Sequence, residues 1–184
     1  MLSPILPRLF SRTAQACRDC GRCLERLHAG AWRPACPRVV AQAPENLRSW
    51  ITWPGSMTKR LEATHGMPIA VEVVFEGRGE PRPDEARLLG KTARPALVRE
   101  VVLRAGAVPV LTARTILPLA TATGINHGLL RLGNRPLGAI LFQSPGVRWE
   151  TREMARDEPG RWGRRTVYLL KGRPLLVAEF FQFN

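Results

Sequence analysis

Hydrophobic and polar positions follow regular patterns in the C-terminal three quarters of the chain, and the first of these patterns predicts a helix. Met57 and Leu61 lie four residues apart, as on one face of a helix. Ser56 is a suitable N-cap, and Gly66 is a suitable C-terminal stop. We therefore expect a short helix over residues 56–65.

The next segment alternates apolar and polar residues, which is typical of a half-buried strand. The predicted strand covers residues 69–76, and its apolar face consists of Ile69, Val71, Val73 and Phe75. Residues 77–95 are rich in glycine, proline and charge, so we expect a loop there.

Two later stretches contain paired apolar runs separated by a short turn, which is typical of β-hairpins. The first hairpin spans residues 96–117 and is expected to turn at Ala105 and Gly106. The second closes the chain, with strands at 164–171 and 174–183 and a turn at Gly172 and Arg173.

Two short helices are predicted between the hairpins, over residues 125–133 and 135–143. These segments together predict an α+β fold, in which short helices pack on an antiparallel sheet of about five or six strands. A chain of 184 residues is near the common size of one domain. We therefore expect a single domain over residues 49–184.

Residues 1–48 lack periodic hydrophobicity, so we expect an irregular or partly helical extension. This segment contains Cys17, Cys20, Cys23 and Cys36, with the spacing C-x2-C-x2-C-x12-C. The first three resemble part of an iron–sulfur ligand run, and four thiolates could also hold tetrahedral zinc. We favour the plainer interpretation, an extension of reduced thiols without a metal.

Composition limits the environment and the partners of the chain. No apolar stretch approaches the roughly 20 residues of a membrane-spanning helix, and the first residues lack the apolar core of a secretory signal, so we expect a cytoplasmic protein. Lysine and arginine total 28 against 15 acidic residues, giving a formal net charge of +13. The basic residues are dispersed, which indicates attraction for small anions more than nucleic-acid binding.

Each of two predicted strands carries one charged residue on its apolar face. Arg99 alternates with three aliphatic residues, and Glu179 alternates with four apolar residues. An isolated charge in an apolar interior is costly, so it persists only when it is paired or used. Two explanations are open: the two residues form a structural ion pair with each other, or they face a closed pocket. In such a pocket Arg99 would bind a ligand carboxylate, and Glu179 would handle a proton or a hydroxyl.

Two predicted helix starts could add binding groups to such a pocket. Met57 and Leu137 fall in first turns, where backbone N–H groups have no partner within the helix and can donate to an anion. Every helix start has this property, so the signal is weak by itself.

Six sequence blocks, taken in order, resemble the bacterial chorismate pyruvate-lyases of ubiquinone biosynthesis. The blocks are SWITWPGSMTKRL (49–61), LVREVVL (97–103), ARTILP (113–118), RPLGAILF (135–142), GRWGRR (160–165) and PLLVAEFF (174–181). Each block is weak alone, whereas the ordered set is specific. The C-terminal EFFQFN departs from the family, whose members usually continue with Leu-Pro after the Glu and Phe.

The resemblance implies a six-stranded antiparallel sheet whose helices cover an internal ligand pocket. It also implies that Arg99 binds a ligand carboxylate and that Glu179 faces the ring oxygen. Met57 and Leu137 are implied to contact the ligand, and Arg114 is implied to be a further arginine near the pocket.

The implied reaction is elimination of pyruvate from chorismate to give 4-hydroxybenzoate, driven by aromatisation of the ring. We expect Glu179 either to act as a general acid in its protonated form or only to orient the substrate. The resemblance implies no metal and no cofactor, and we expect a monomer. The alternative function is a non-catalytic small-molecule-binding module of the same fold.

Overall fold

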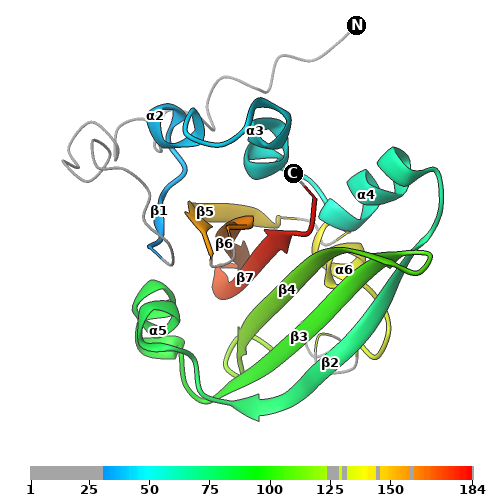
Figure 1. Ribbon diagram of the computed structural model, residues 1–184. Coiled ribbons are helices and arrows are strands. Elements are labelled where there is room, and N and C mark those ends of the chain that lie inside the picture. Colours follow the sequence, from blue (N-terminus) through cyan, green and yellow to red (C-terminus); the bar gives the residue numbers. More distant parts are fainter. Residues whose placement is uncertain (1–30, 124–128, 130–131, 144–145, 158–159, 184) are drawn as a thin grey trace, which may run out of the picture.

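The structure is a computed structural model that describes residues 31–123, 129, 132–143, 146–157 and 160–183. Its main element is a seven-stranded sheet in the order β1-β5-β6-β7-β4-β3-β2, with antiparallel neighbours throughout (Figure 1). The strands are β1 (Arg33–Pro34), β2 (Ile69–Gly79), β3 (Ala96–Ala105), β4 (Val108–Pro118), β5 (Arg148–Arg156), β6 (Trp162–Leu170) and β7 (Arg173–Phe181). The helices are α2 (Pro37–Val40), α3 (Glu45–Thr52), α4 (Met57–His65), α5 (Pro83–Leu89), the 3-10 helix η2 (Gly90–Thr92) and α6 (Leu137–Leu141).

Both predicted hairpins are present, and they lie side by side because β4 pairs with β7. The first turns one residue later than predicted, at Gly106 and Ala107, since β3 continues to Ala105. The second turns one residue earlier, at Lys171 and Gly172. These hairpins and the helices packed on them confirm the α+β class.

The prediction of five or six strands is wrong, because the sheet also contains β5 and the two-residue β1. The sequence pattern hides β5. Arg152 projects from one side of this strand toward the backbone of α3, and Glu153 projects from the other side toward Arg165. Charged residues on both sides remove the apolar alternation by which a strand is recognised.

The predicted loop over residues 77–95 is also wrong, since β2 extends to Gly79 and is followed by α5 and η2. Pro83 is the first residue of α5, a position where the missing N–H of proline costs little. Glu85 reaches back and accepts a hydrogen bond of 2.8 Å from the backbone N–H of Arg82. Proline and charge therefore mark a helix start here.

Helix α4 confirms the helix predicted over residues 56–65. The hydroxyl of Ser56 accepts a hydrogen bond of 3.4 Å from the backbone N–H of Lys59, and Gly66 ends the helix with a φ of 64°. The helix predicted over residues 135–143 is present in shorter form as α6. The one predicted over 125–133 lies mostly outside the described residues.

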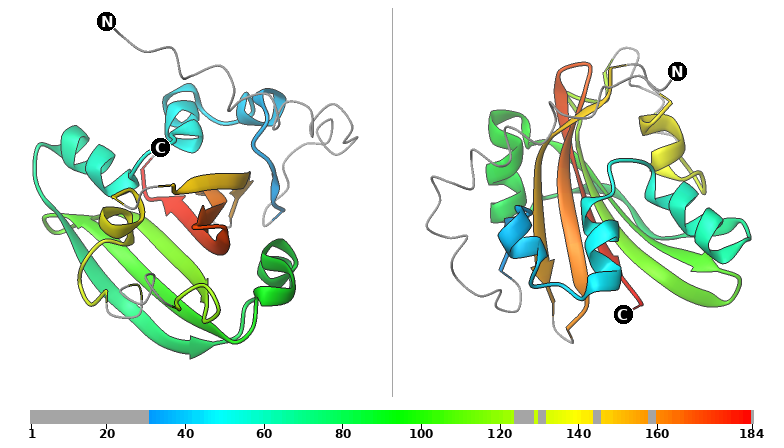
Figure 2. Two further views of the ribbon diagram at one scale, coloured as in Figure 1. Left: turned by 180° about the vertical axis from the view of Figure 1, so that it is seen from behind. Right: turned by 90° about the horizontal axis from the view of Figure 1, so that it is seen from above.

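The sheet separates α5 from α4 and α6 (Figure 2). We call the side that faces α5, which includes Val98 and Leu176, the α5 face. The opposite side, which we call the α4 face, carries two apolar clusters. One joins α2, α3 and α4 to residues such as Leu111, and the other joins α6 to residues such as Leu175.

The described part of the predicted N-terminal extension, residues 31–48, packs into the same core as the residues that follow it. In this part of the chain, residue 48 therefore does not separate an extension from the domain. Cys36, Val39 and Leu47 are fully buried in the same cluster as Leu61. Burial of one such aliphatic side chain contributes about 1.5–3 kcal/mol. Cys17, Cys20 and Cys23 lie outside the described residues.

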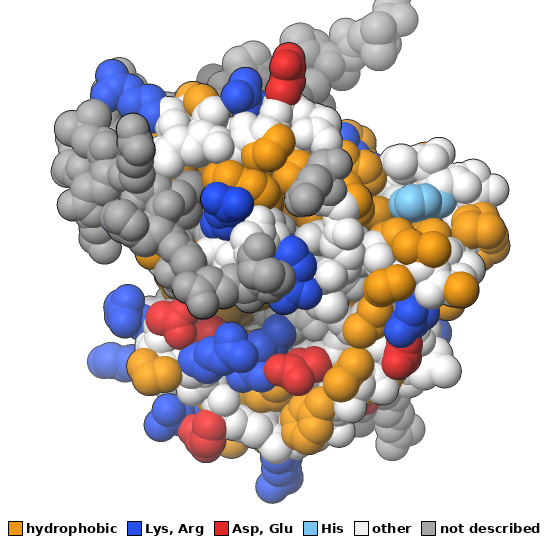
Figure 3. All heavy atoms as spheres, in the orientation of Figure 1, with side chains coloured by type: hydrophobic (Ala, Val, Ile, Leu, Met, Phe, Trp, Pro, Cys, Tyr) orange, Lys and Arg blue, Asp and Glu red, His pale blue; other side chains and the backbone are white. Residues whose placement is uncertain are grey.

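Among the described helices, none is long and apolar enough to traverse a bilayer. On the surface seen in Figure 3, basic side chains of the described residues are interspersed with acidic and apolar ones. This distribution agrees with the dispersed positive charge of the sequence.

Candidate active site

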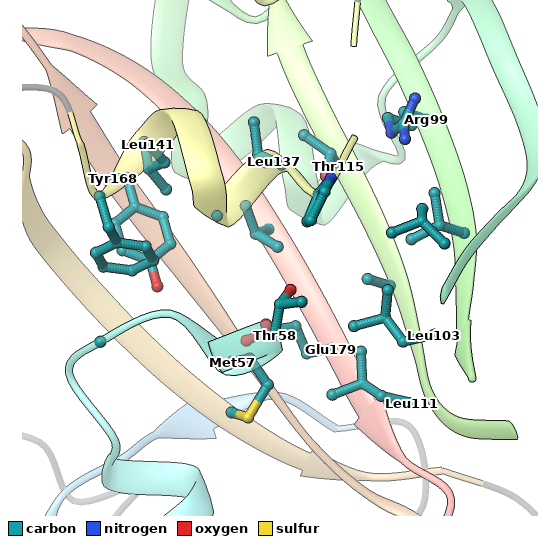
Figure 4. A pocket seen from close by; sticks show the side chains of 18 of the residues that line it. Met57, Thr58, Arg99, Leu103, Leu111, Thr115, Leu137, Leu141, Tyr168 and Glu179 are labelled. Carbon is teal, nitrogen blue, oxygen red and sulfur yellow. The ribbon is translucent and has the colours of Figure 1, made fainter. Parts of the chain in front are cut away.

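A cavity on the α4 face has about 60 Å³ of space for water-sized molecules. Side chains of β2, β3, β4, β6 and β7 line it from the sheet, and the first residues of α4 and α6 line it from the opposite side (Figure 4). Four residues singled out from the sequence border it, namely Met57, Arg99, Leu137 and Glu179. The structure therefore brings these four residues to one cavity.

Arg99 lies on β3 and is only 3% exposed. One terminal nitrogen forms an ion pair with Glu76, and the other donates to the carbonyl oxygens of Gly133, at 2.7 Å, and Arg135, at 3.4 Å. Burial lowers the pKa of the Arg99 guanidinium. A buried planar cation of this kind is suited to a carboxylate that takes the place of the carbonyl oxygens.

A β-bulge in β2 brings Glu76 to this arginine. Val73 pairs with Val101, but the register then shifts by one residue, so that Glu76 and not Phe75 is opposite Arg99. The prediction that Phe75 shares the inner face with Val73 is therefore wrong. A bulge inserts one residue and reverses the sides of all later side chains, and alternation alone does not reveal it.

Glu179 lies on β7 and is 8% exposed. Its Oε2 accepts a hydrogen bond of 2.6 Å from Nε of Arg164, which is directly opposite it on β6. The proposed ion pair between Arg99 and Glu179 is therefore wrong, because each has its own partner. Strand β4 separates their strands, and Thr115 of β4 also lines the cavity (Figure 4).

The sequence analysis missed Arg164, although it belongs to the quoted block GRWGRR. The side chain is fully buried, and Nη1 donates to the carbonyl oxygens of Trp53, at 2.5 Å, and Trp50, at 3.2 Å. These carbonyls belong to the end of α3 and to the loop that leads into α4. Arg164 therefore connects Glu179 to the segment that leads to Met57.

Arg152 on β5 is a second buried arginine that the sequence analysis missed. Its Nη1 donates to the carbonyl of Trp53 at 2.8 Å, and its Nε donates to the hydroxyl of Thr166 at 3.0 Å. Burial, with the nearby charge of Arg164 as the next cause, lowers the pKa of Arg152 to about 10, against the opposing effects of Tyr168 and Glu179. Arg152 therefore stays charged at neutral pH in a place that disfavours its charge.

Met57 and Leu137 are the first residues of α4 and α6, and these two helix ends touch. A Cβ atom added to Gly138 would lie only 2.8 Å from the hydroxyl oxygen of Ser56. Glycine at this position permits the close approach of the two helices beside the cavity.

Arg114, which was predicted to lie near the pocket, does not line this cavity, although its neighbours Ala113 and Thr115 do. It lies on the α5 face, where its nitrogens donate to Glu85 at 2.8 Å and to Glu100 at 2.7 Å. Burial would lower the pKa of Arg114, but the bonds to Glu85 and Glu100 outweigh burial and raise it. Because side chains alternate along β4, Arg114 and the cavity residue Thr115 face opposite sides.

The described residues contain no group of three or more histidine, cysteine and acidic side chains that could hold a metal ion. Of the four cysteines, only Cys36 is among these residues, and it is buried in the apolar cluster of α2 and α3. The iron–sulfur and zinc alternatives both include cysteines that lie outside the described part of the chain.

Comparison with known proteins gives a consistent result. The family model described as "Chorismate lyase" matches residues 27–183. A "Probable chorismate pyruvate-lyase" of Methylococcus capsulatus is 44% identical over 151 residues, which cover 73% of this chain and 93% of that protein. A protein of the same name from Aromatoleum aromaticum is 38% identical, covering 85% and 94%. The "Chorismate pyruvate-lyase" of Escherichia coli K12 is 39% identical, covering 79% and 87%.

Proposed function

Because this chain belongs to the chorismate lyase family, we propose that it eliminates pyruvate from chorismate and releases 4-hydroxybenzoate. The observation that carries the proposal is the cavity bordered by both Arg99 and Glu179. A cation and a carboxylate that border one cavity suit a substrate with an acidic group and a hydroxyl on one ring. We further propose that the product serves as the aromatic precursor of ubiquinone and that the enzyme acts as a cytoplasmic monomer.

In the proposed complex, Arg99 binds the ring carboxylate. The carboxylate oxygens take the place of the carbonyls of Gly133 and Arg135, which now accept from Nη2 of Arg99. A carboxylate gives a stronger, charge-assisted interaction with the guanidinium than two neutral carbonyls do. Backbone N–H groups at Met57 and Leu137 complete the contacts to the ligand.

Glu179 faces the ring hydroxyl in this complex. Its pairing with Arg164 at 2.6 Å supports a carboxylate that accepts a hydrogen bond from the hydroxyl. This favours the orienting role over that of a protonated general acid. During the reaction the C3–O ether bond breaks, C4 loses its hydrogen as a proton, and the ring becomes aromatic. The ether oxygen leaves with the bonding electron pair as the enolate of pyruvate, and one proton, equivalent to the one lost from C4, adds to its methylene carbon to give pyruvate.

The cavity is small for this substrate, since sites for small molecules commonly measure about 300–1,000 Å³. Its space for water-sized molecules is about 60 Å³. We therefore propose that the first turns of α4 and α6 move away from the sheet when chorismate enters. Such gating by short segments is common in enzymes that exclude water during reaction.

The direct test is incubation of the purified full-length protein with chorismate. We expect 4-hydroxybenzoate and pyruvate to appear in equal amounts, without added metal and unchanged by EDTA. A folded sample that binds 4-hydroxybenzoate but forms neither product would instead support the non-catalytic binding module. A folded sample that neither binds nor reacts would refute both functions.

A further inference from the structure

Two buried arginines next to Glu179 carry more positive charge than this carboxylate can neutralise. Arg164 is fully buried and Arg152 is 5% exposed, and both donate to the carbonyl oxygen of Trp53. The only carboxylate hydrogen-bonded to either arginine among the described residues is Glu179, through Arg164. Buried charges are costly unless they are paired or used.

Each of the two arginines also has an unused donor. The hydrogen bonds of Arg164 to the described residues are made by Nε and Nη1, so its Nη2 stays available to a ligand in the cavity that Arg164 borders. Nη2 of Arg152 is buried and has no acceptor among the described residues, which is rare in proteins. Arg152 does not line the cavity, so an acceptor on a ligand would be contacted by Arg164, which borders the cavity, and not by Arg152.

The position of this pair relative to the cavity indicates what the acceptor is. Arg164 and Tyr168 border the cavity beside Glu179, whereas Arg152 stands behind them. In chorismate the enolpyruvyl ether is on the carbon next to the hydroxyl-bearing carbon and away from the ring carboxylate. If Glu179 holds the hydroxyl and Arg99 holds the ring carboxylate, the enolpyruvyl carboxylate falls on the side of Arg164.

We propose that Arg164, supported by the charge of Arg152, binds the enolpyruvyl carboxylate of the substrate. This inference rests on the proposed function. Arg164 is then a substrate-binding residue, and Arg152 is a positioning residue that acts through Arg164. Arg99 binds one carboxylate of the substrate, and Arg164 binds the other. Glu179 is on β7, which lies between the strands of the two arginines. After elimination only the ring carboxylate stays on the product, so the second contact distinguishes chorismate from 4-hydroxybenzoate.

A purely structural role would be to hold the loop after α3, since both arginines donate to its carbonyls. Disturbance of this loop would displace Met57 and would weaken binding of substrate and product alike. The two roles therefore differ in whether the affinity for 4-hydroxybenzoate changes together with that for chorismate.

The test compares Arg152→Met with Arg148→Met, a control on the same strand whose side chain is exposed. We expect Arg152→Met to raise the KM for chorismate about 10-fold and to change the Kd of 4-hydroxybenzoate less than about twofold. Arg148→Met should change neither quantity. Equal weakening of both ligands by Arg152→Met, or an unchanged KM, would overturn the proposal.

Two further measurements keep the outcome decisive. If Arg152→Met does not fold, Arg152→Gln, which keeps a donor for the Trp53 carbonyl, takes its place under the same criterion. If the unaltered protein does not turn over chorismate, the proposed function fails. Equilibrium binding of chorismate and of 4-hydroxybenzoate to the unaltered protein and to the variant then still tests the second carboxylate subsite.

Discussion

The two faces of the sheet both carry buried arginines, but their charges are balanced differently. On the α4 face, three arginines are accompanied by two carboxylates: Glu76 pairs with Arg99, Glu179 pairs with Arg164, and the third arginine is Arg152. On the α5 face, two arginines are paired with four carboxylates; these groups are Arg114 and Arg165 with Asp84, Glu85, Glu100 and Glu153. Among these groups, an excess of positive charge exists only on the α4 face.

If cavity volume alone were used to locate the site, it would favour the α5 face. The α5 face carries a cavity of about 350 Å³, lined by Trp32, Phe180 and the paired arginines, against about 60 Å³ on the α4 face. On the α5 face the four carboxylates outnumber the two arginines, so the charge of these groups disfavours a dianionic substrate, whereas on the α4 face three arginines outnumber two carboxylates. We therefore base the proposed site on the unbalanced buried charge of the α4 face and not on the larger volume of the cavity on the α5 face.

Loss of the carboxylate on the α4 face is expected to have the largest effect. We expect Glu179→Ala to lower kcat about 100-fold and Glu179→Gln about 10-fold, because the amide oxygen still accepts a hydrogen bond from the ring hydroxyl. Initial rates of pyruvate release measure both effects. Glu153→Ala on the α5 face, which removes a partner of Arg165, is the matched control and should preserve kcat. Equal losses in Glu179→Ala and Glu179→Gln would contradict the orienting role.

Substitution of one arginine on each face should have opposite consequences. Arg99→Met should weaken 4-hydroxybenzoate binding about 10-fold, because a charge-assisted bond to the ligand is lost. Arg114→Met should leave that affinity unchanged but reduce the free energy of unfolding by about 2 kcal/mol, since the buried Glu85 loses its partly buried partner.

Calorimetric titration with 4-hydroxybenzoate and urea unfolding of both variants separate the two effects. The prediction is contradicted if Arg114→Met weakens 4-hydroxybenzoate binding as strongly as Arg99→Met does. It is also contradicted if Arg99→Met destabilises the fold but leaves the Kd of 4-hydroxybenzoate unchanged.

An exposed ion pair should have the smallest effect of all. Arg94 and Glu80 form a contact of 2.8 Å, but their side chains are 58% and 74% exposed. Solvent screens such a pair, so Glu80→Gln should change the free energy of unfolding by less than about 0.5 kcal/mol. Urea unfolding beside Arg114→Met provides the comparison. A loss as large as that of Arg114→Met would show that burial does not decide the strength of these pairs.

Local sequence determined the parts of the protein that depend on neighbouring residues. The helix at Met57 follows from its N-cap and its terminal glycine, and the two hairpins follow from apolar runs on either side of short turns. The same alternation identified Arg99 and Glu179 as charges on inner faces, and the ordered blocks pointed to the family. These features were predictable because each depends on residues a few positions apart.

The partners of those charges were decided only by the tertiary structure. Glu179 pairs with Arg164 because β6 lies beside β7 in register, while β4 keeps β3 and Arg99 one strand further away. Glu76 reaches Arg99 only because of the bulge in β2, and Arg152 is buried because β5 joins the sheet. The order and register of strands depend on long-range pairing, which the pattern within a single strand does not contain.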